Sequence, residues 1–411
     1  MLTRRKLIAA GGLALAGCNG ASLSASAKPN WNWKLLVPHS KTQTNIPVPR
    51  DSWNGMLAHN HSLYLFGGVY PRYGPPRGPA DLKTMGSLND LWRYDITEKS
   101  WQRLQADNGL ADFQNGSTRP CGRVLPCWVE VGGKFYLFGG LTSVAKGWKM
   151  KLLNDLWQFN PSSKRWTLLE GDDQRHMKNS TKVGTRPETI AAMGAAAIGR
   201  RIYLYSGWGG TRSRVVLSSQ LWSFDVVTRK WRFHGDERRS NWPAKRYCPA
   251  FTAYKGKLYL CGGRDSESPR PQFYNDLWTF NPQTNRWRQL LKSDRSDTKR
   301  PSPRYAMGHA RIGNQWIQFA GFGNNRGNSP QLNDLWQLDL DSGLWRKLQE
   351  HNGYKVTGPQ AQRPCVRRVP AMTAIGKHAY LFGGLDLTSG PQEDGPLIAF
   401  NDLWQGELKS S

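Results

Sequence analysis

Two short stretches decide the fold: FYLFGG at Phe135–Gly140, and NDLWQFN at Asn154–Asn160, which is followed by a further tryptophan at Trp166. The tetrapeptide Asn-Asp-Leu-Trp recurs along the chain, and in five units a second tryptophan stands nine residues after the first. The six copies, of which the third is the variant Ser-Gln-Leu-Trp, begin at Asn89, Asn154, Ser219, Asn275, Asn333 and Asn401. Self-similarity of this kind predicts a fold assembled from copies of one supersecondary unit.

Each unit holds four short runs rich in Val, Ile, Phe, Tyr and Trp, separated by turn residues, which is typical of short strands. In the second unit these runs are Val124–Val131, Phe135–Phe138, Asp155–Phe159 and Trp166–Leu169. A pair of glycines, or a variant in which only the second glycine is kept, follows the second run. A neighbouring backbone is expected to approach closely at this point. The repeat therefore predicts an all-β protein of six four-stranded units.

An arginine stands 17 residues before the second glycine of the pair in four units, at Arg123, Arg246, Arg304 and Arg367. At the same spacing the first unit has Asp51 and the third has Ile190. The order arginine, glycine pair, Asn-Asp-Leu-Trp and final tryptophan resembles the kelch repeat, and the resemblance extends from Trp31 to the end of the chain. It implies a β-propeller whose four-stranded blades surround a central channel.

The place where the last unit ends predicts how the ring closes. Six units indicate six blades, and the sixth ends at Ser411 before its second tryptophan. The sequence Trp33–Leu36 is similar to Trp166–Leu169, the outermost run of the second unit. We therefore expect Trp31–Val37 to supply the outer strand of the last blade, which removes the open sheet edges.

The amino terminus is typical of an export signal. A basic segment, Met1–Lys6, precedes an apolar run of ten residues, Leu7–Ala16, whereas a membrane-spanning helix needs about 20 such residues. Thr3–Ile8 resembles a twin-arginine signal, and Leu15–Cys18 resembles a bacterial lipobox, in which the cysteine becomes the lipidated first residue. The alternative is an ordinary cleaved signal in which Cys18 is incidental.

These features predict three segments: a signal peptide over residues 1–17, a flexible tether over 18–30 and the propeller over 31–411. The resemblance to exported lipoproteins implies a location on the periplasmic or cell-surface side, with the protein held to a membrane through Cys18 alone.

The composition at first points to a different class of protein. The 411 residues include 57 Lys and Arg against 30 Asp and Glu, a formal charge of +27, which is typical of nucleic-acid binding. Export argues against DNA or RNA as a partner, and removal of residues 1–17 leaves +24. A hydrophobic content of 38% is too high for a disordered chain. The positive charge therefore needs another explanation.

Strand order assigns the connections to two faces. The turns between the first and second runs are tight, as in Val131–Lys134, whereas the loops after the glycine pairs are long, as in Leu385–Phe400. Long loops on a rigid scaffold usually carry function, so we expect a ligand site on the long-loop face. The repeated arginines begin the innermost strands and are expected to open onto this face near the channel.

A ring of guanidinium groups at a channel mouth would hold carboxylate, sulfate or phosphate. Further arginines stand four residues before the repeated ones, and Trp208 falls beside a long-face loop, where a flat ring would suit an acidic sugar. The candidate ligand-binding residues are Arg123, Arg246, Arg304, Arg367, Arg119, Arg363 and Trp208. The alternative is that the arginines brace the loops by binding backbone carbonyls.

The sequence contains no metal or cofactor pattern that would identify an enzyme class, so we expect neither group. The closest enzyme analogy is the periplasmic six-bladed sialic acid mutarotase, which implies a general acid/base pair and an arginine for the carboxylate. Glu188, Asp51 and Tyr305 are the catalytic candidates, with Arg246 or Arg304 as the clamp.

Three functions remain open. The first, which we favour, is a monomeric lipid-anchored module that binds an anionic carbohydrate or envelope polymer. The second is an enzyme acting on an acidic sugar, such as a mutarotase or epimerase. The third is a protein–protein scaffold without a small ligand.

Overall fold

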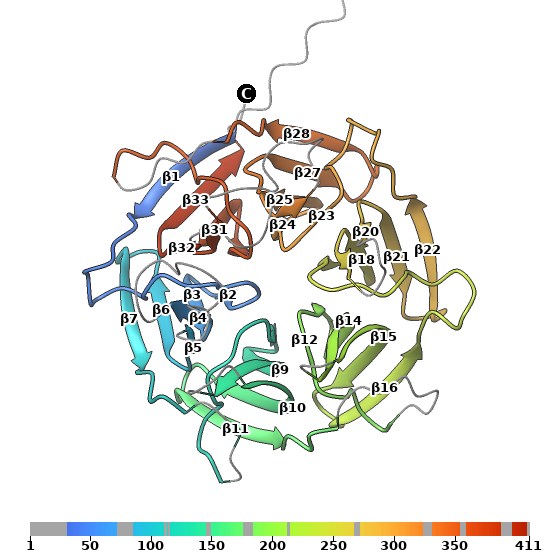
Figure 1. The fold of residues 1–411 in the computed structure, drawn as a ribbon, viewed down its shortest axis with the longest axis horizontal. Helices are drawn as coiled ribbons and strands as arrows, with labels where there is room; N and C mark the ends of the chain where they lie inside the picture. The colour runs from blue at the N-terminus through green and yellow to red at the C-terminus, as the bar shows by residue number, and fades with distance from the viewer. Residues whose placement is uncertain are drawn as a thin grey trace, which may run out of the picture.

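In the computed structural model, antiparallel sheets stand around a central axis as the blades of a propeller (Figure 1). The structure describes residues 31–71, 85–110, 113, 116–144, 149–175, 184–211, 214–266, 272–323, 331–353, 359–387 and 397–408. Within these ranges every regular element is a strand. The predicted all-β, six-bladed propeller is confirmed.

Each blade contains four strands that run in order from the channel to the rim. Blade 1 consists of β2 (Met56–His59), β3 (Ser62–Phe66), β6 (Leu91–Asp95) and β7 (Ser100–Gln105). Blade 2 consists of β8 (Cys127–Val131), β9 (Lys134–Val144), β10 (Lys149–Asn160) and β11 (Arg165–Glu170). Blade 3 consists of β13 (Gly194–Ile198), β14 (Arg201–Thr211), β15 (Arg214–Asp225) and β16 (Lys230–Gly235).

The other three blades repeat this arrangement. Blade 4 consists of β17 (Ala250–Tyr254), β18 (Lys257–Cys261), β21 (Leu277–Asn281) and β22 (Arg286–Leu291). Blade 5 consists of β24 (Gly308–Ile312), β25 (Gln315–Phe319), β27 (Leu335–Asp339) and β28 (Trp345–Gln349). Blade 6 consists of β29 (Ala371–Ile375), β30 (His378–Phe382), β33 (Leu403–Leu408) and β1 (Trp31–Val37).

The amino-terminal strand closes the ring. β1 pairs antiparallel with β33, and Trp33 lies opposite Gly406. Because β1 takes the rim position that β33 would otherwise leave open, residues from the two ends of the described chain share one sheet. The predicted closure by Trp31–Val37 is confirmed.

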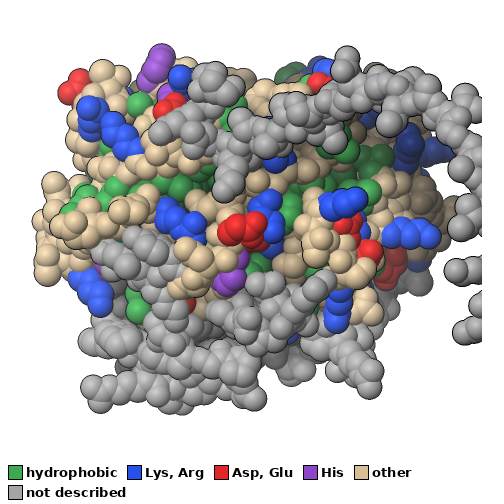
Figure 2. Space-filling view, turned by 90° about the horizontal axis from the view of Figure 1, so that it is seen from above, with side chains coloured by type: hydrophobic (Ala, Val, Ile, Leu, Met, Phe, Trp, Pro, Cys, Tyr) green, Lys and Arg blue, Asp and Glu red, His purple; other side chains and the backbone are tan. Residues whose placement is uncertain are grey.

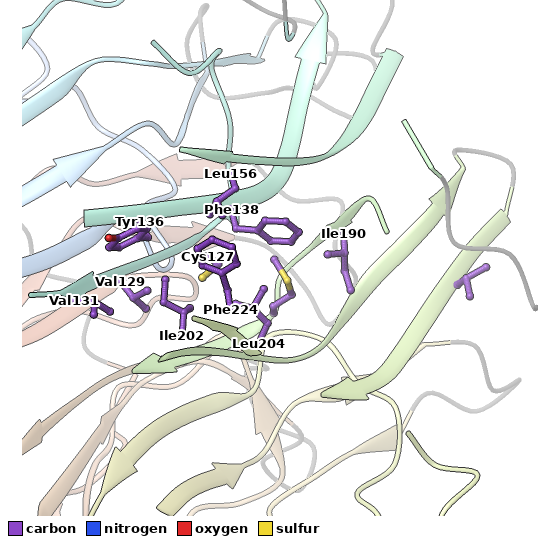
Figure 3. Packing of buried hydrophobic residues seen from close by; sticks show 12 residues of the cluster. Cys127, Val129, Val131, Tyr136, Phe138, Leu156, Ile190, Ile202, Leu204 and Phe224 are labelled. Carbon is purple, nitrogen blue, oxygen red and sulfur yellow. The ribbon is translucent and has the colours of Figure 1, made fainter. Parts of the chain in front are cut away.

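Apolar side chains fill the spaces between neighbouring blades. Between blades 2 and 3 the cluster in Figure 3 contains Phe138 of β9, Leu204 of β14 and Phe224 of β15. The second tryptophan of a unit packs on the residue before the glycine pair of the preceding blade, with ring centroids 5.1–5.5 Å apart. These pairs are Trp101–Phe382, Trp166–Phe66, Trp231–Phe138, Trp287–Tyr205 and Trp33–Phe319. The repeated aromatic residues thus hold neighbouring blades together at five of the six junctions.

The connections after the glycine pairs fold back as small sheets on the long-loop face. The two-stranded sheets are β4 (Val69–Pro71) with β5 (Met85–Ser87), β19 (Arg264–Asp265) with β20 (Gln272–Phe273), β23 (Arg304–Tyr305) with β26 (Phe322–Gly323), and β31 (Leu385–Leu387) with β32 (Leu397–Ala399). In blade 3 the short strand β12 (Ile190–Ala191) pairs with β14 in the same way. These pairings fix the segments that surround the channel on this face.

A chain of backbone hydrogen bonds runs around the channel from blade to blade. The amides of Ala192, Cys248, Ala306, Val369 and Ser52 each donate to the corresponding carbonyl of a neighbouring blade, over 2.9–3.4 Å. In blade 1 the loop before β2 reaches into the centre of the ring (Figure 1). There the indole of Trp53 donates to the Met307 carbonyl of blade 5, and Asn54 donates to the Met193 carbonyl of blade 3. Trp53 is only 2% exposed, so this loop fills the channel at that level.

Candidate functional site

Buried arginine–aspartate pairs lie inside five of the six blades. Each arginine reaches the aspartate of the Asn-Asp-Leu-Trp motif in its own blade, with the closest N–O distance between 2.6 and 2.8 Å. The pairs are Arg50–Asp90, Arg123–Asp155, Arg246–Asp276, Arg304–Asp334 and Arg367–Asp402. In each pair both terminal nitrogens of the guanidinium bind the carboxylate, and one also donates to a carbonyl of the glycine-pair segment, as Arg123 does to Gly139.

Two blades differ from the pattern expected from spacing alone. In blade 1 the paired arginine is Arg50, which donates to the Gly67 carbonyl, and Asp51 is its neighbour. Blade 1 has one more residue between the arginine and the glycine pair than blade 2, and this shifted the alignment. In blade 3 Ile190 replaces the arginine and Gln220 replaces the aspartate, so both members of the pair are absent together.

The electrostatics of these pairs keep them charged. Burial by itself would lower the pKa of Arg246, but the Asp276 carboxylate raises it overall. Burial would raise the pKa of Asp334 and Asp402, but the ion pairs with Arg304 and Arg367 bring both below the usual range. The guanidinium groups of Arg123, Arg246, Arg304 and Arg367 are thus bound by carboxylates and carbonyls of the protein itself. These contacts agree with the alternative in which the repeated arginines brace the loops.

The arginines four residues earlier make loop contacts farther out. Arg119 donates to the Ala106 carbonyl over 2.8 Å, and Arg363 donates to the Glu350 carbonyl over 3.3 Å and to Asn352. Arg186 binds Glu170 and Asp173. All three are half-buried, so they brace the loops while part of each side chain remains accessible to solvent.

A second group of cationic and aromatic side chains gathers where the channel opens on the long-loop face. We call it the mouth cluster, and its members are Arg264, Phe273, Tyr305, Phe322 and Arg368. The Arg264 guanidinium lies 5.2 Å from the Phe273 ring and 5.4 Å from the Tyr305 ring, and the Arg368 guanidinium lies 5.7 Å from the Phe322 ring. The cluster thus brings two cations and three rings together from blades 4, 5 and 6.

Asp51 of blade 1 adds a carboxyl group beside this cluster. The amide of Ser52 donates to the Val369 carbonyl, so the residues before them, Asp51 and Arg368, lie on adjacent blades. Burial raises the pKa of Asp51 to about 7, while a backbone hydrogen bond from Trp53 and the charge of Arg368 act in the opposite direction. A carboxyl group of this kind gains or loses its proton near neutral pH.

The other candidates are more widely spread. Tyr305 belongs to the mouth cluster, whereas Glu188 is a half-buried residue of blade 3 just before β12. Trp208 is half-buried in β14 and packs on the small apolar cluster that contains Val124 and Leu152. The structure therefore brings Asp51 and Tyr305 to the same mouth but leaves their proposed clamps, Arg246 and Arg304, inside the blades.

The mouth cluster was largely missed by sequence reasoning. Arg264, Phe273 and Phe322 occupy the segments after the glycine pairs, which differ from unit to unit and follow no repeat. Tyr305 was among the catalytic candidates, and the same repeat could have identified Arg368, because the two residues directly follow the repeated arginines Arg304 and Arg367.

Within the described ranges no three His, Cys, Asp or Glu side chains come together in a way that could hold a metal ion. The five cysteines there, Cys121, Cys127, Cys248, Cys261 and Cys365, are buried free thiols. No described segment forms a helix able to cross a bilayer. The predicted signal, tether and lipid site at Cys18 fall in residues 1–30, outside the described part of the chain.

Comparison with known proteins identifies relatives of the whole ring. The profile of the KLHDC2/KLHL20/DRC7 Kelch-repeats domain matches residues 4–181, 119–300 and 173–384. Kelch domain-containing protein 10 of Bos taurus and that of Homo sapiens are each 25% identical to the chain over 315 residues, which cover 76% of this chain and 64% of the relative. The Leucine-zipper-like transcriptional regulator 1 homolog of Drosophila melanogaster is 25% identical over 332 residues, 80% of this chain and 29% of that protein. The chain thus spans less than two thirds of the length of these relatives.

Proposed function

The chain belongs to the kelch-repeat family, and from this premise we propose that it is an exported, lipid-anchored interaction module that binds an anionic partner on its long-loop face. Kelch propellers generally mediate protein–protein interactions. The signal over residues 1–17 and a lipid on Cys18 would hold this module at a membrane on the periplasmic or cell-surface side.

The observation that carries the proposal is the position of Arg368. This residue is half-buried, its guanidinium lies over the Phe322 ring, and it has no ion-pair partner in the described part of the chain. The arginines inside the blades are the opposite case, since each is bound by an aspartate. A guanidinium held in place by a ring and not neutralised by a carboxylate is suited to bind one from a ligand.

The rings of the cluster define the rest of the ligand. Phe273 is half-buried and would offer a flat apolar surface next to Arg264, whereas Tyr305 and Phe322 are buried and support the cations. A partner that carries a carboxylate beside an apolar face fits this combination. An acidic sugar of an envelope polymer has that chemistry, and so does an acidic protein segment, which would suit the third hypothesis.

Binding assays with the purified protein test the proposal. A panel of acidic and neutral glycans and acidic peptides is screened at low salt. Arg368→Ala is expected to weaken binding of an anionic ligand by about tenfold or more, because a partly desolvated charge loses its partner. The matched control is Arg165→Ala, an exposed arginine on β11 of blade 2.

The pH dependence sharpens this test. As the pH falls from 8 to 6, Asp51 takes up a proton around its pKa of about 7, which removes a negative charge that competes for Arg368. Anion binding should therefore strengthen towards pH 6, and Asp51→Asn should make it independent of pH. If no anionic ligand binds at low salt, or if Arg368→Ala binds as well as the control, the proposal is wrong.

One observation favours the enzyme hypothesis as a second candidate. A carboxyl group with a pKa of about 7 near Arg368, such as that of Asp51, suits general acid/base catalysis near neutral pH. In this version Arg368, and not Arg246 or Arg304, would hold the substrate carboxylate. NMR of a freshly dissolved single anomer of an acidic sugar decides the point, since Asp51→Asn should abolish any acceleration of anomer exchange.

A further inference from the structure

Two neighbouring outer segments of the propeller rim each carry an excess of positive charge. Residues 226–239, which include β16, contain five Lys or Arg and two Asp or Glu, and residues 283–299, which include β22, have the same balance. We call these two segments of blades 3 and 4 the basic rim. Their exposed strand positions are Lys230, Arg232, Arg286 and Arg288.

The equivalent segments of blades 1, 2 and 5 are balanced, whereas residues 31–41 of blade 6 contain two lysines and no acidic residue. Residues 96–109 of blade 1 and 340–353 of blade 5 each contain two Lys or Arg and two Asp or Glu, and residues 161–175 of blade 2 contain three of each. Figure 2 shows the edge formed by blades 5 and 6, where Lys and Arg side chains alternate with Asp and Glu. The basic rim is therefore a local feature and does not follow from the repeat.

The two halves of the basic rim are joined into one surface. The His234 ring at the end of β16 hydrogen-bonds the Asn285 side chain just before β22, over 2.6 Å, and Asn285 donates to the His234 carbonyl over 3.1 Å. Asn241 donates to the Trp287 carbonyl of β22 over 2.9 Å. These contacts hold the exposed cations of neighbouring blades in a fixed relative position.

The rim cations have few internal partners, and apolar side chains lie among them. In the described part of the chain Arg232, Arg286 and Arg288 form no ion pair. Two of the three large hydrophobic side chains found exposed there fall within the basic rim, Val227 at 66% and Leu290 at 36%. Arginine with exposed aliphatic residues is typical of protein interfaces, in which arginine is enriched and lysine depleted.

We propose that the basic rim is a second interface, which binds an acidic surface of a protein partner. Alternate exposed residues on a strand lie about 6.6 Å apart, so Arg232 and Arg288 with their strand neighbours present a regular array of donors for carboxylates. Val227 and Leu290 supply the apolar contact that a bare polyanion would not use. A second copy of this chain is not the partner, because it has few acidic residues and five of them are in buried pairs.

The basic rim lies apart from the amino-terminal strand. β1 enters the ring in blade 6, across the ring from blade 3 (Figure 1). The amino-terminal segment therefore joins the ring on the side opposite the basic rim. The rim is also separate from the mouth cluster, so the two interfaces can be tested one by one.

The test measures binding of the full chain to two labelled peptides, one alternating glutamate with leucine and one alternating glutamate with serine. The rim variant is Arg232→Glu with Arg288→Glu, and its matched control is Arg165→Glu with Arg346→Glu on the outer strands of blades 2 and 5. The control changes the net charge equally. The rim variant should weaken binding of the glutamate–leucine peptide by about tenfold or more, and the control by less than about twofold.

The serine peptide should bind the wild type more weakly than the leucine peptide. Arg368→Ala, which changes only the mouth cluster, should weaken binding of the leucine peptide less than the rim variant does. Equal losses in the rim variant and the control would overturn the inference, because they would show a response to net charge only. Rim-dependent binding of heparin or of phosphatidylglycerol vesicles, without binding of the leucine peptide, would overturn it in favour of a polysaccharide or lipid. If Arg368→Ala alone abolishes peptide binding, the mouth and not the rim is the protein interface.

Discussion

At the scale of the residue, position decides what an arginine does in this protein. Arg246 occupies the repeated arginine position of blade 4, and Arg368 stands one residue after the same position in blade 6. Arg246 is fully buried against Asp276, whereas Arg368 lies half-buried over Phe322. Blade 3 shows that the buried pair acts as a unit, since Ile190 and Gln220 replace both members together. Gln220 still accepts the hydrogen bond of the motif tryptophan, Trp222, over 2.8 Å.

This exchange in blade 3 leads to a prediction for blade 4. Arg246→Ile should lower the free energy of unfolding by about 3–5 kcal/mol, because it leaves the Asp276 carboxylate buried without its partner. Adding Asp276→Gln should restore most of that loss, since the double variant has the blade 3 residues. Urea denaturation of the two variants and the wild type provides the measurement. A double variant as unstable as the single one would show that blade 3 is stabilised in another way.

At the scale of the element, the strands at the rim hold the ring together. The second tryptophan of each outer strand packs on an aromatic ring of the preceding blade at five junctions, and Trp33 of β1 makes this contact with Phe319. β1 also covers the free edge of β33 by backbone pairing from Trp31 to Val37. The short amino-terminal strand therefore joins blade 6 both to its own sheet and to blade 5.

Deletion of residues 31–37 tests the closure. The loss of the buried Trp33 alone is expected to cost about 3–5 kcal/mol, which for a domain of this size lowers Tm by about 4–6 °C. The exposed edge of β33 should also promote aggregation. Thermal unfolding is compared with that of a control lacking only residues 19–30. An unchanged Tm in the longer deletion would contradict the role assigned to β1.

At the scale of the whole molecule, the charge separates into three classes. The arginines of the five buried pairs are neutralised inside the blades, those of the mouth cluster face the long-loop side, and those of the basic rim lie on blades 3 and 4. The loop with Trp53 fills the channel, so the mouth is one end of a closed ring and not the entrance to a pore. Part of the formal charge of +27 is therefore found on two separate surfaces, the mouth cluster and the basic rim.

The stability of the whole ring should depend on pH in two opposite ways. The folded-state pKa values of Asp334 and Asp402 are lowered by their arginines, so their contribution is present above the ordinary pKa of about 4 and is lost as the pH falls through the folded values. The pKa of Asp51 is raised to about 7, so stability decreases as the pH rises from about 4 to 7.

Tm measured from pH 2.5 to 8 checks both effects. Burial also lowers the pKa values of His234 and His309 to about 4, which adds stability as the pH rises from about 4 to 6.5. The effect of Asp51 is therefore measured as the difference in Tm between Asp51→Asn and the wild type, which should grow from about pH 4 to 7 and leave the acid limb unchanged. The Tm of Asp51→Asn should thus be higher than that of the wild type at pH 8 and equal to it at pH 4. An increase in Tm of the same size at both pH values would show that Asp51 does not titrate in this range.

The sequence by itself determined the number of blades, their strands, the closure by Trp31–Val37 and the place of the arginines in the repeat. These features depend on contacts within one unit or between adjacent units, and such contacts recur and leave a regular spacing. Even the buried pairs leave a trace in the sequence, since the unit without the aspartate also lacks the arginine.

Only the tertiary structure decided which cations are available to a partner. Whether an arginine is buried depends on a carboxylate about 30 residues away that its strand brings into reach, as Asp276 reaches Arg246. The mouth cluster gathers residues from three blades and the basic rim joins two, through segments that do not repeat. Spacing along the chain describes one blade at a time, whereas these surfaces form only where the closed ring places different blades together.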